Sequence, residues 1–246
     1  MQVLGVIPAR FKSTRLEGKP LADIHGKPMV QHVYENACRA TTLDRVVVAT
    51  DDERVRRAVT AFGGEVVMTN PAHSCGTERV AETAQRYDAG IIINIQGDEP
   101  LMDPIIIDEC ARALRDNPDV GISTVMKRIP EEAYNDPAVV KVICDLRGRA
   151  LYFSRSLIPY PRFRTPEFAA FEHIGIYGYT RECLARISQI PPSPLERIEG
   201  LEQLRALENG IAIQVVESAF TGDLVSVDTP EDLERVRAIL SNGVAV

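Results

Sequence analysis

The sequence predicts an α/β fold: a mostly parallel, Rossmann-like sheet flanked by helices, with an inserted β-rich lobe. In the first half, short β-branched runs alternate with segments of helical apolar spacing, as in parallel sheets covered on both faces. After about residue 117 the rhythm changes, and strand-like runs follow one another with few helices between them. We therefore expect one domain over residues 1–246, with the β-rich lobe at about 118–180.

Each element of the first half has its own signal. Four apolar runs of strand length predict strands over 3–9, 45–50, 64–69 and 90–96. Apolar residues at helical spacing predict helices over 27–40, 51–63 and 76–90. Gly63 and Gly90 are typical helix ends, and Thr50 and Asp51 are suited to cap the second helix.

The second half is predicted to be richer in strands. Strand-like runs occupy 121–129, 138–145, 150–155, 173–180 and 211–217. A proline-rich stretch predicts a helix that starts at about Pro194, because proline is tolerated in the first turn. The last helix is expected over 228–240, with acidic residues in its first turn, where the helix dipole favours them.

Composition restricts the class of protein. The 246 residues carry a formal net charge of −7, which argues against a nucleic-acid or anionic-membrane binder, because such proteins need a broad basic face. A small polyanion in one local basic pocket remains possible. Five scattered cysteines without a CxxC pair indicate reduced thiols, and no apolar run reaches the ~20 residues of a membrane helix. We expect a cytoplasmic protein.

A basic loop follows the first predicted strand. Arg10, Lys12, Arg15 and Lys19 lie between Ala9 and Pro20, with hydroxyl residues among them. Cations, hydroxyls and exposed amides on a short loop suit a phosphate chain, although a merely solvated loop fits the same residues. The P-loop pattern GxxxxGK[ST] and the dinucleotide pattern GxGxxG are both absent.

Two aspartates are candidate metal ligands. Asp98 follows the fourth predicted strand in "NIQGDEP", where it either binds Mg²⁺ together with substrate phosphates or simply belongs to a polar turn. Asp228 precedes Thr-Pro-Glu-Asp, which is also an excellent helix start, so on local grounds alone it is a cap. Ligands of open parallel sheets bind at the carboxyl ends of strands, and Asp98 follows such an end.

Three further stretches have a functional and a structural interpretation. Gly76 and Thr77 begin a helix, whose amide groups either bind a polar ligand or are only capped, and the nearby His73 has no evident partner. The strand 173–180 places His173, Tyr177 and Tyr179 on one face, which lines a ligand or packs as an aromatic core. Glu199, Glu202 and Gln203 share one helix surface that is solvated by default.

As an ordered set, these segments resemble one family. "IPARFKSTRLEGKPL", "HSCGTERVAE", "NIQGDEP", "ALYFSRSLIP", "HIGIYGY", "PSPLERIEGLEQLRALENG" and "VDTPEDLERV" follow the order of the 3-deoxy-manno-octulosonate cytidylyltransferases, from about Val3 to Ile239. The resemblance implies a nucleotide-diphospho-sugar-transferase-like fold and an enzyme that joins CTP to the anomeric hydroxyl of 3-deoxy-D-manno-octulosonate (Kdo) for lipopolysaccharide biosynthesis. It also implies Mg²⁺ as the cofactor and a homodimer formed through the β-rich lobe.

The resemblance assigns roles residue by residue. Arg10, Ser13 and Lys19 match the phosphate-binding loop, and Asp98 and Asp228 match the magnesium carboxylates; Arg10, Lys19, Asp98 and Asp228 are the expected catalytic residues. The positions that match the surroundings of the cytidine are Pro8, Ala9, Gly76 and Thr77. The positions that match the sugar-acid side are Gln96, Arg155, His173, Tyr177, Glu202 and Gln203.

Two departures from the family pattern concern the nucleotide. Cys75 stands where the family usually has serine, so a weak thiol replaces a good hydroxyl partner, and Glu17 replaces a proline in the phosphate loop. We expect altered nucleotide affinity rather than lost function. A glycosyltransferase of related fold and a CTP-binding regulator without turnover are the two alternatives.

Overall fold

The computed structural model of the chain describes residues 1–12, 16–163, 165 and 168–242. The chain divides into two compact units. The first contains residues 1–108 and 222–246, and the second contains residues 109–221. The second unit is therefore an insertion into the first, and it extends beyond the predicted lobe at 118–180 on both sides, to residues 109 and 221.

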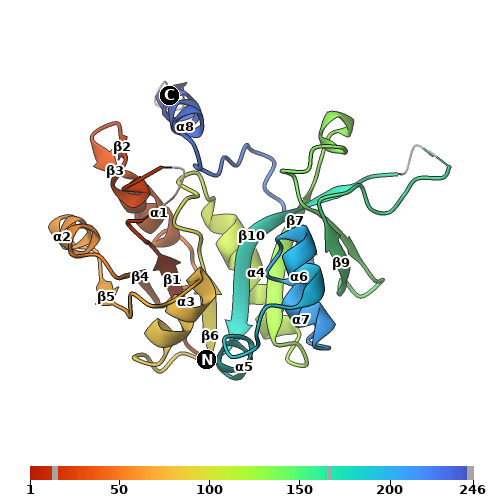
Figure 1. Ribbon diagram of the computed structural model, residues 1–246, viewed down its shortest axis with the longest axis horizontal. Coiled ribbons are helices and arrows are strands. Elements are labelled where there is room, and N and C mark those ends of the chain that lie inside the picture. Colours follow the sequence, from red (N-terminus) through yellow and green to blue (C-terminus); the bar gives the residue numbers. More distant parts are fainter. Residues whose placement is uncertain (13–15, 164, 166–167, 243–246) are drawn as a thin grey trace. The chain divides into compact units, whose positions relative to one another are not determined.

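The first unit is built on a parallel sheet (Figure 1). Its strands are β1 (Val3–Pro8), β4 (Arg45–Thr50), β5 (Val66–Met68) and β6 (Ile91–Asn94). β1 lies in the middle and pairs in parallel with β4 on one side and with β6 on the other, while β5 pairs with β4. The four predicted strands of the first half are thus confirmed, and their carboxyl ends share one edge.

This sheet packs against the helices α1 (Met29–Ala37), α2 (Glu53–Ala61) and α3 (Gly76–Ala84). The C-terminal helix α8 (Pro230–Asn242) contacts the short strand β2 (Asp23–Ile24) instead. A further helix, α4 (Pro104–Asp116), leads the chain into the second unit and is not among the helices predicted from the sequence. In the described residues, no helix combines the length and the apolar character needed to cross a bilayer.

The predicted helix 27–40 begins two residues later than expected. Lys27 and Pro28 form the short strand β3, which pairs antiparallel with β2 (Asp23–Ile24). The two turn residues both have positive φ, 51° at His25 and 81° at Gly26, as a two-residue hairpin requires. The sequence did not predict this turn, because its first residue is histidine instead of the Asn or Asp that usually precedes glycine in such turns.

The C-terminal segment packs back on the N-terminal part of the same unit. A buried apolar cluster combines Ile24 and Met29 with Val225, Val227 and Val236. The amide of Val227 also donates to the carbonyl oxygen of Asp98 at 2.9 Å. The beginning of α8 is therefore fixed beside the loop that follows β6.

The second unit is rich in antiparallel strands, as predicted. Its strands are β7 (Ile122–Arg128), β8 (Lys141–Cys144), β9 (Ala150–Ser154), β10 (Phe171–Thr180) and β11 (Ile213–Glu217). β7 pairs antiparallel with β10 and parallel with β11, and β8 pairs antiparallel with both β9 and β10. A short 3-10 helix, η2 (Glu131–Ala133), follows β7.

The helices of the second unit are short: α5 (Arg181–Ile187), α6 (Pro194–Glu199) and α7 (Leu204–Glu208). The predicted start at Pro194 is confirmed, but the continuous helix expected from it is not. Gly200 takes a left-handed conformation with φ 63°, and the amide of Leu201 closes the turn onto the carbonyl oxygen of Glu196 at 3.2 Å. This is a helix C-cap, so Gly200 ends α6.

A buried lysine stabilises the second unit. The ammonium of Lys141, whose residue is 0% exposed, donates to three backbone carbonyls, those of Asp136 (2.8 Å), Val139 (2.6 Å) and Arg155 (2.7 Å). Burial lowers the pKa of Lys141 because desolvation disfavours its charged form. The side chain joins the loop before β8 to the end of β9.

We expect Lys141→Met to lower the free energy of unfolding by about 1 to 3 kcal/mol, because the carbonyls lose their donor while the stem volume is kept. Denaturant unfolding of the whole protein measures this loss. Lys27→Met is the matched control: Lys27 pairs with Glu35 at the surface, and its loss should cost at most about 1 kcal/mol. Equal stability of the wild type and Lys141→Met would contradict this role.

Candidate active site

A cleft lies at the carboxyl ends of β1 and β6. It has a volume of about 400 Å³. Its lining residues come from the first unit only: Pro8, Ala9, Arg10, Lys12, Lys19, Pro20, Gly76, Gln96, Gly97, Asp98 and Asp228. All four expected catalytic residues are among them, together with three of the expected cytidine neighbours and one expected sugar contact.

Gly97 allows the two strand ends to approach each other. Beyond β6, the amide of Ile95 still donates to the carbonyl of Val6 at 2.9 Å. A Cβ atom at Gly97 would lie only 2.5 Å from the carbonyl oxygen of Pro8, so no side chain fits there. The backbone of Gly97 therefore lies against the end of β1, and Asp98 follows at the rim of the cleft.

Asp98 and Asp228, far apart in the sequence, lie at one point of this cleft. The ammonium nitrogen of Lys19 is 2.8 Å from Asp98 Oδ2 and 3.1 Å from Asp228 Oδ1. The three side chains are 14%, 28% and 32% exposed in the order Lys19, Asp98, Asp228. The two carboxylates thus share one cation, which shows that they converge.

The capping alternative for Asp228 does not hold. α8 is capped by Thr229, whose hydroxyl accepts from the amide of Asp232 at 3.2 Å, while Asp232 Oδ2 accepts from the amides of Asp228 (3.1 Å) and Thr229 (2.9 Å). This reciprocal pair is a capping box. Asp228 precedes it, and its carboxylate accepts a hydrogen bond from Lys19 instead.

The Asp98 and Asp228 carboxylates fit a magnesium ion that arrives with phosphates. Carboxylate oxygens are hard donors, and Mg²⁺ is usually held by one or two carboxylates while waters and substrate phosphates complete its octahedron. The described residues contain no group of three or more His, Cys, Asp or Glu side chains that could hold a metal. The pair would therefore need ligand oxygens from a bound substrate.

The expected cytidine positions lie around the N-terminus of α3. Gly76 begins this helix and lies beside the ring of Pro8, and Thr77 is buried at 5% exposure. Arg10 Nη1 donates to the carbonyl of Ser74 at 3.2 Å, which links the basic loop to this turn. Cys75 occupies the N-cap position in extended backbone, and its thiol makes no capping hydrogen bond. Ser13 lies outside the described residues.

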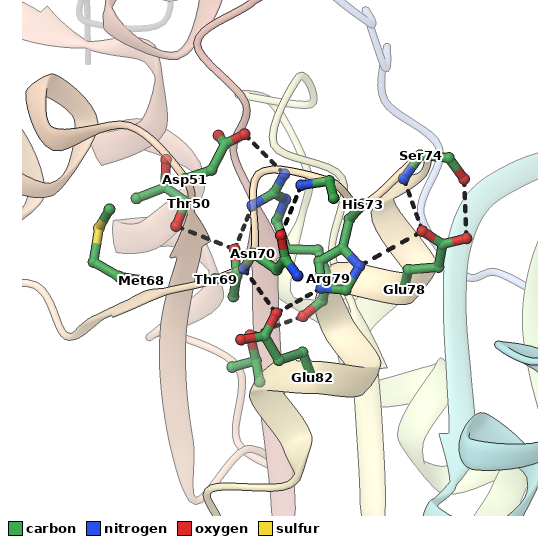
Figure 2. A network of polar contacts seen from close by, with 12 residues as sticks. Thr50, Asp51, Met68, Thr69, Asn70, His73, Ser74, Glu78, Arg79 and Glu82 are labelled. Carbon is green, nitrogen blue, oxygen red and sulfur yellow. Dashed lines mark hydrogen bonds and ion pairs between the residues drawn. The ribbon is translucent and has the colours of Figure 1, made fainter.

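His73 has carboxylate partners, contrary to the expectation from the sequence (Figure 2). Its Nε2 is 2.5 Å from Glu82 Oε2, and its Nδ1 is 3.6 Å from Glu78 Oε2. Glu78 also accepts from the amide of Ser74 at 2.7 Å, and Glu82 accepts from the amide of Asn70 at 2.8 Å. The network fixes the loop before Gly76. The signal was available: Glu78 and Glu82 are four residues apart, on one face of α3.

Five of the expected sugar residues belong to the second unit, and Arg155 is the most firmly held of them. It follows β9, and its Nε and Nη1 donate to the carbonyls of Glu199 (2.7 Å) and Pro137 (2.8 Å). The Glu199 carboxylate accepts from the amide of Arg155 (3.0 Å) and from the hydroxyl of Ser154 (2.7 Å). Glu199 therefore holds Arg155 in place by hydrogen bonds. The sequence predicted only a solvated surface for Glu199 and did not indicate this role.

His173 lies in an aromatic row on β10. Its ring centroid is 5.0 Å from that of Phe153 and 5.3 Å from that of Tyr177. The Tyr177 and Tyr179 rings are stacked at 6.1 Å. The shared face expected from alternation is present, and aromatic packing is a large part of its role. Of the remaining two residues, Gln203 is buried at 8% exposure and Glu202 is half-buried.

His173 is a neutral imidazole at physiological pH. Burial lowers its pKa to about 3, because desolvation disfavours the imidazolium. Its Nε2 lies 3.0 Å from the hydroxyl oxygen of Thr124, and that hydroxyl has the carbonyl of Ile176 as an acceptor at 2.7 Å. With the single hydroxyl proton given to this carbonyl, Nε2 of His173 is the protonated nitrogen. The ring can hydrogen-bond to a sugar but cannot neutralise an acid by charge.

Comparisons with known proteins agree with this geometry. The sequence pattern of the family described as cytidylyltransferase matches residues 4–214. A 3-deoxy-manno-octulosonate cytidylyltransferase from Solibacter usitatus is 52% identical over 99% of this chain and 96% of its own length. One from Geobacter sulfurreducens is 50% identical over 96% of this chain and 98% of its own.

A solved structure is similar over the whole chain. It is the CMP:2-keto-3-deoxy-manno-octonic acid synthetase complexed with CTP, which is 46% identical and superposes with a TM-score of 0.93. The match covers 99% of this chain and 100% of that one. The predicted fold class, that of nucleotide-diphospho-sugar transferases, is confirmed by this match.

Fold, cleft and comparisons define a nucleotidyltransferase, an enzyme that transfers a nucleotidyl group from a nucleoside triphosphate. The family pattern narrows this class to transfer of the cytidylyl group. With about half of its residues identical to those of named members over nearly its full length, the chain belongs to the 3-deoxy-manno-octulosonate cytidylyltransferase family.

Proposed function

We propose that this enzyme couples CTP to the anomeric hydroxyl of Kdo and releases CMP-Kdo and pyrophosphate, with CMP-Kdo serving lipopolysaccharide biosynthesis. The observation that carries the proposal is the cleft at the ends of β1 and β6, which combines Arg10, Lys12 and Lys19 with Asp98 and Asp228. Cations suit a triphosphate, and carboxylates suit the metal that a triphosphate carries. The relatives' names supply the nucleotide and the sugar.

The reaction is an in-line displacement at the α-phosphorus. A bond forms between this phosphorus and the anomeric oxygen of Kdo, and the bond to the β-phosphate bridging oxygen breaks, so that pyrophosphate leaves. Positioning and charge neutralisation supply most of the catalysis in such a step. Arg10 and Lys19, with Ser13, are proposed to hold the leaving pyrophosphate. We nominate no side chain as the general base.

Asp98 and Asp228 are proposed to hold Mg²⁺. A bound Mg²⁺ would polarise the α-phosphoryl group and lower the pKa of the attacking hydroxyl. The carboxylates would contribute two of the hard oxygen ligands. The two residues stay close together because the amide of Val227 donates a hydrogen bond to the carbonyl oxygen of Asp98. The pair therefore positions the α-phosphate region of the nucleotide relative to the basic loop.

The remaining residues are proposed to select the substrates. Pro8, Ala9 and Gly76, which line the cleft, and Thr77, which follows Gly76 on α3, are proposed to surround the cytidine. Arg155 carries the charge that pairs with the Kdo carboxylate, whereas the neutral His173 hydrogen-bonds to the sugar. The residues proposed for the other sugar contacts are Gln96, Tyr177, Glu202 and Gln203.

A pyrophosphate-release assay tests the function. CTP and Mg²⁺ are mixed with a panel of 3-deoxy sugar acids that includes Kdo and its 8-amino form, and ATP, GTP and UTP serve as control nucleotides. Release with CTP and Kdo supports the proposal. Binding of CTP without release with any sugar acid would favour a regulator, and consumption of a finished nucleotide-sugar would favour a glycosyltransferase.

Replacing Arg155 should impair the use of Kdo selectively. In Arg155→Ala we expect the KM for Kdo to rise about tenfold or more, while the KM for CTP changes less than about threefold, because a charge-assisted bond to the sugar carboxylate is lost. Arg162→Ala removes an exposed cation of the same unit and should change neither constant. A rise confined to the KM for CTP would refute the assignment.

We also propose that the enzyme is a cytoplasmic homodimer. An apolar groove of about 440 Å³ on the second unit, with the 59% exposed Leu151 at its edge, supports a subunit contact through the lobe. All five cysteines lie in the described part of the chain and none forms a disulfide, which supports a reducing compartment. Sedimentation of the purified protein measures the oligomeric state.

A further inference from the structure

The ammonium of Lys19 lies where a metal shared by Asp98 and Asp228 would have to lie. One nitrogen atom is within hydrogen-bond distance of both carboxylates, at 2.8 and 3.1 Å. Mg²⁺ approaches carboxylate oxygens to about 2.0–2.1 Å and demands near-octahedral geometry. An ammonium between the two carboxylates and a metal held by both of them therefore exclude each other.

Hydrogen bonds hold the backbone on both sides of Lys19, so its side chain is the part that can move most easily. Lys19 begins the 3-10 helix η1 (Lys19–Leu21), preceded by Gly18 with φ 70°. The amide of Gly18 donates to the carbonyl of Phe11 at 3.0 Å, and the amide of Leu21 donates to the carbonyl of Gly18 at 2.8 Å. The flexible four-carbon stem of lysine can still carry its ammonium to another acceptor.

A triphosphate provides that acceptor. Arg10 and Lys12 line the same cleft, so phosphate oxygens drawn to them come within the reach of the Lys19 stem. When the ammonium turns to a phosphate, both of its ion pairs break, and the carboxylate oxygens that it held are released together. Without a nucleotide, the same release would leave the lysine charge without a partner of comparable strength.

We propose that Lys19 is an internal counter-ion that keeps the metal out of the nucleotide-free site and moves to the phosphates when the nucleotide binds. The metal site is thereby formed only with the nucleotide, and the entering species is the metal–nucleotide complex. This inference rests on the proposed function, because it uses the same cleft and the same carboxylates. It differs from that function in predicting how the empty enzyme treats a metal alone.

The test is Mn²⁺ binding to the nucleotide-free protein, followed by the electron paramagnetic resonance signal of free Mn²⁺. Lys19→Met removes the charge and keeps an unbranched side chain. We expect it to bind Mn²⁺ about tenfold more tightly than the wild type. In the wild type, the metal must first break two partly exposed ion pairs, and their combined free energy corresponds to a factor of about ten in affinity. Lys19→Gln, which is also uncharged, should show the same gain and replaces Lys19→Met if that variant does not fold.

Two control variants locate the effect. Lys12→Met removes a cation that lines the same cleft but forms no ion pair with either carboxylate in the described part of the chain, and it should change Mn²⁺ affinity less than about threefold. Adding Asp98→Asn to Lys19→Met should abolish the gain. Unchanged or weaker Mn²⁺ binding in Lys19→Met, an equal gain in Lys12→Met, or a gain that survives Asp98→Asn would each overturn the inference.

The outcome is independent of the pyrophosphate-release assay. If the wild type releases pyrophosphate from CTP and Kdo while Lys19→Met shows no gain in Mn²⁺ affinity, the proposed function stands and the counter-ion role fails. If no pyrophosphate is released but the gain is present, the counter-ion role describes the carboxylate pair and the proposed reaction is wrong.

Discussion

Asp98→Asn lowers kcat by at least about 100-fold at saturating Mg²⁺, the size of loss seen when one group that stabilises transition-state charge is removed. The change keeps the shape of the side chain and replaces a carboxylate by an amide, a much poorer ligand for Mg²⁺. Asp98 is one of only two carboxylates that line the cleft in the described residues, so little is left to compensate for it. Steady-state pyrophosphate release with CTP and Kdo measures the effect.

A neighbouring aspartate gives the matched control. Asp103 lies five residues further along, at the start of α4, where its Oδ1 accepts from the amide of Ile105 at 2.9 Å. Asparagine caps helices about as well as aspartate, so Asp103→Asn should leave kcat and stability unchanged. A near-normal kcat in Asp98→Asn, with the Mg²⁺ concentration raised well above that needed by the wild type, would refute the metal role of Asp98.

Much of this site was predictable because of one property of parallel sheets. The carboxyl ends of adjacent parallel strands meet at one edge, so polar residues directly after two strands of such a sheet are expected to be close in space. Arg10 follows β1 and Asp98 follows β6, and the structure has both in one cleft. Recognition of the two strands was sufficient to predict that Arg10 and Asp98 lie close together, although not what they bind.

The role of Asp228 cannot be predicted from its neighbours in the sequence. Its neighbours form a capping motif, and a capping residue and a ligand have the same local sequence. Only the resemblance to a family favoured the ligand. The structure shows that Asp228 is not the cap and where it lies instead: Val225 and Val227 join the cluster around Met29, and this contact places Asp228 beside Lys19. No periodicity in the sequence encodes such a contact.

Other missed features also depend on contacts between distant residues. Glu199 accepts a hydrogen bond from Arg155, which is 44 residues away in the sequence, and Lys141 donates to the carbonyl of Arg155 from 14 residues away. A polar residue on a short helix is solvated by default, and only the tertiary fold shows which ones are not. The break at Gly200 is of another kind: a glycine in a helical pattern signals either an end or a tolerated interior position, and the sequence does not say which.

The largest effect on stability is expected from Asp51, the carboxylate partner of a buried arginine (Figure 2). Arg79 on α3 is 0% exposed, and its Nη2 lies 3.2 Å from Asp51 Oδ2, at the carboxyl end of β4. Its Nη1 donates to the hydroxyl of Thr69. The side chain thus connects the ends of β4 and β5 to the helix that carries Gly76 and Thr77.

We expect Asp51→Ala to lower the free energy of unfolding by about 2 to 4 kcal/mol, because a buried guanidinium loses the charge that compensates its desolvation. This loss in the free energy of unfolding is smaller than for a fully buried ion pair, because Asp51 is 20% exposed and water can partly replace its carboxylate. Denaturant unfolding measures the loss. Asp88→Ala removes an exposed carboxylate of the same unit and should cost no more than about 0.5 kcal/mol.

The double variant Asp51→Ala/Arg79→Met separates the two sources of this loss. Most of the cost of Asp51→Ala comes from an arginine left charged and buried, so replacing that arginine by an apolar side chain of similar length should recover part of the lost stability. If the double variant is instead less stable than Asp51→Ala by the full cost of a second independent substitution, then Arg79 is held mainly by packing. In that case the ion pair contributes little to positioning α3 at the nucleotide cleft.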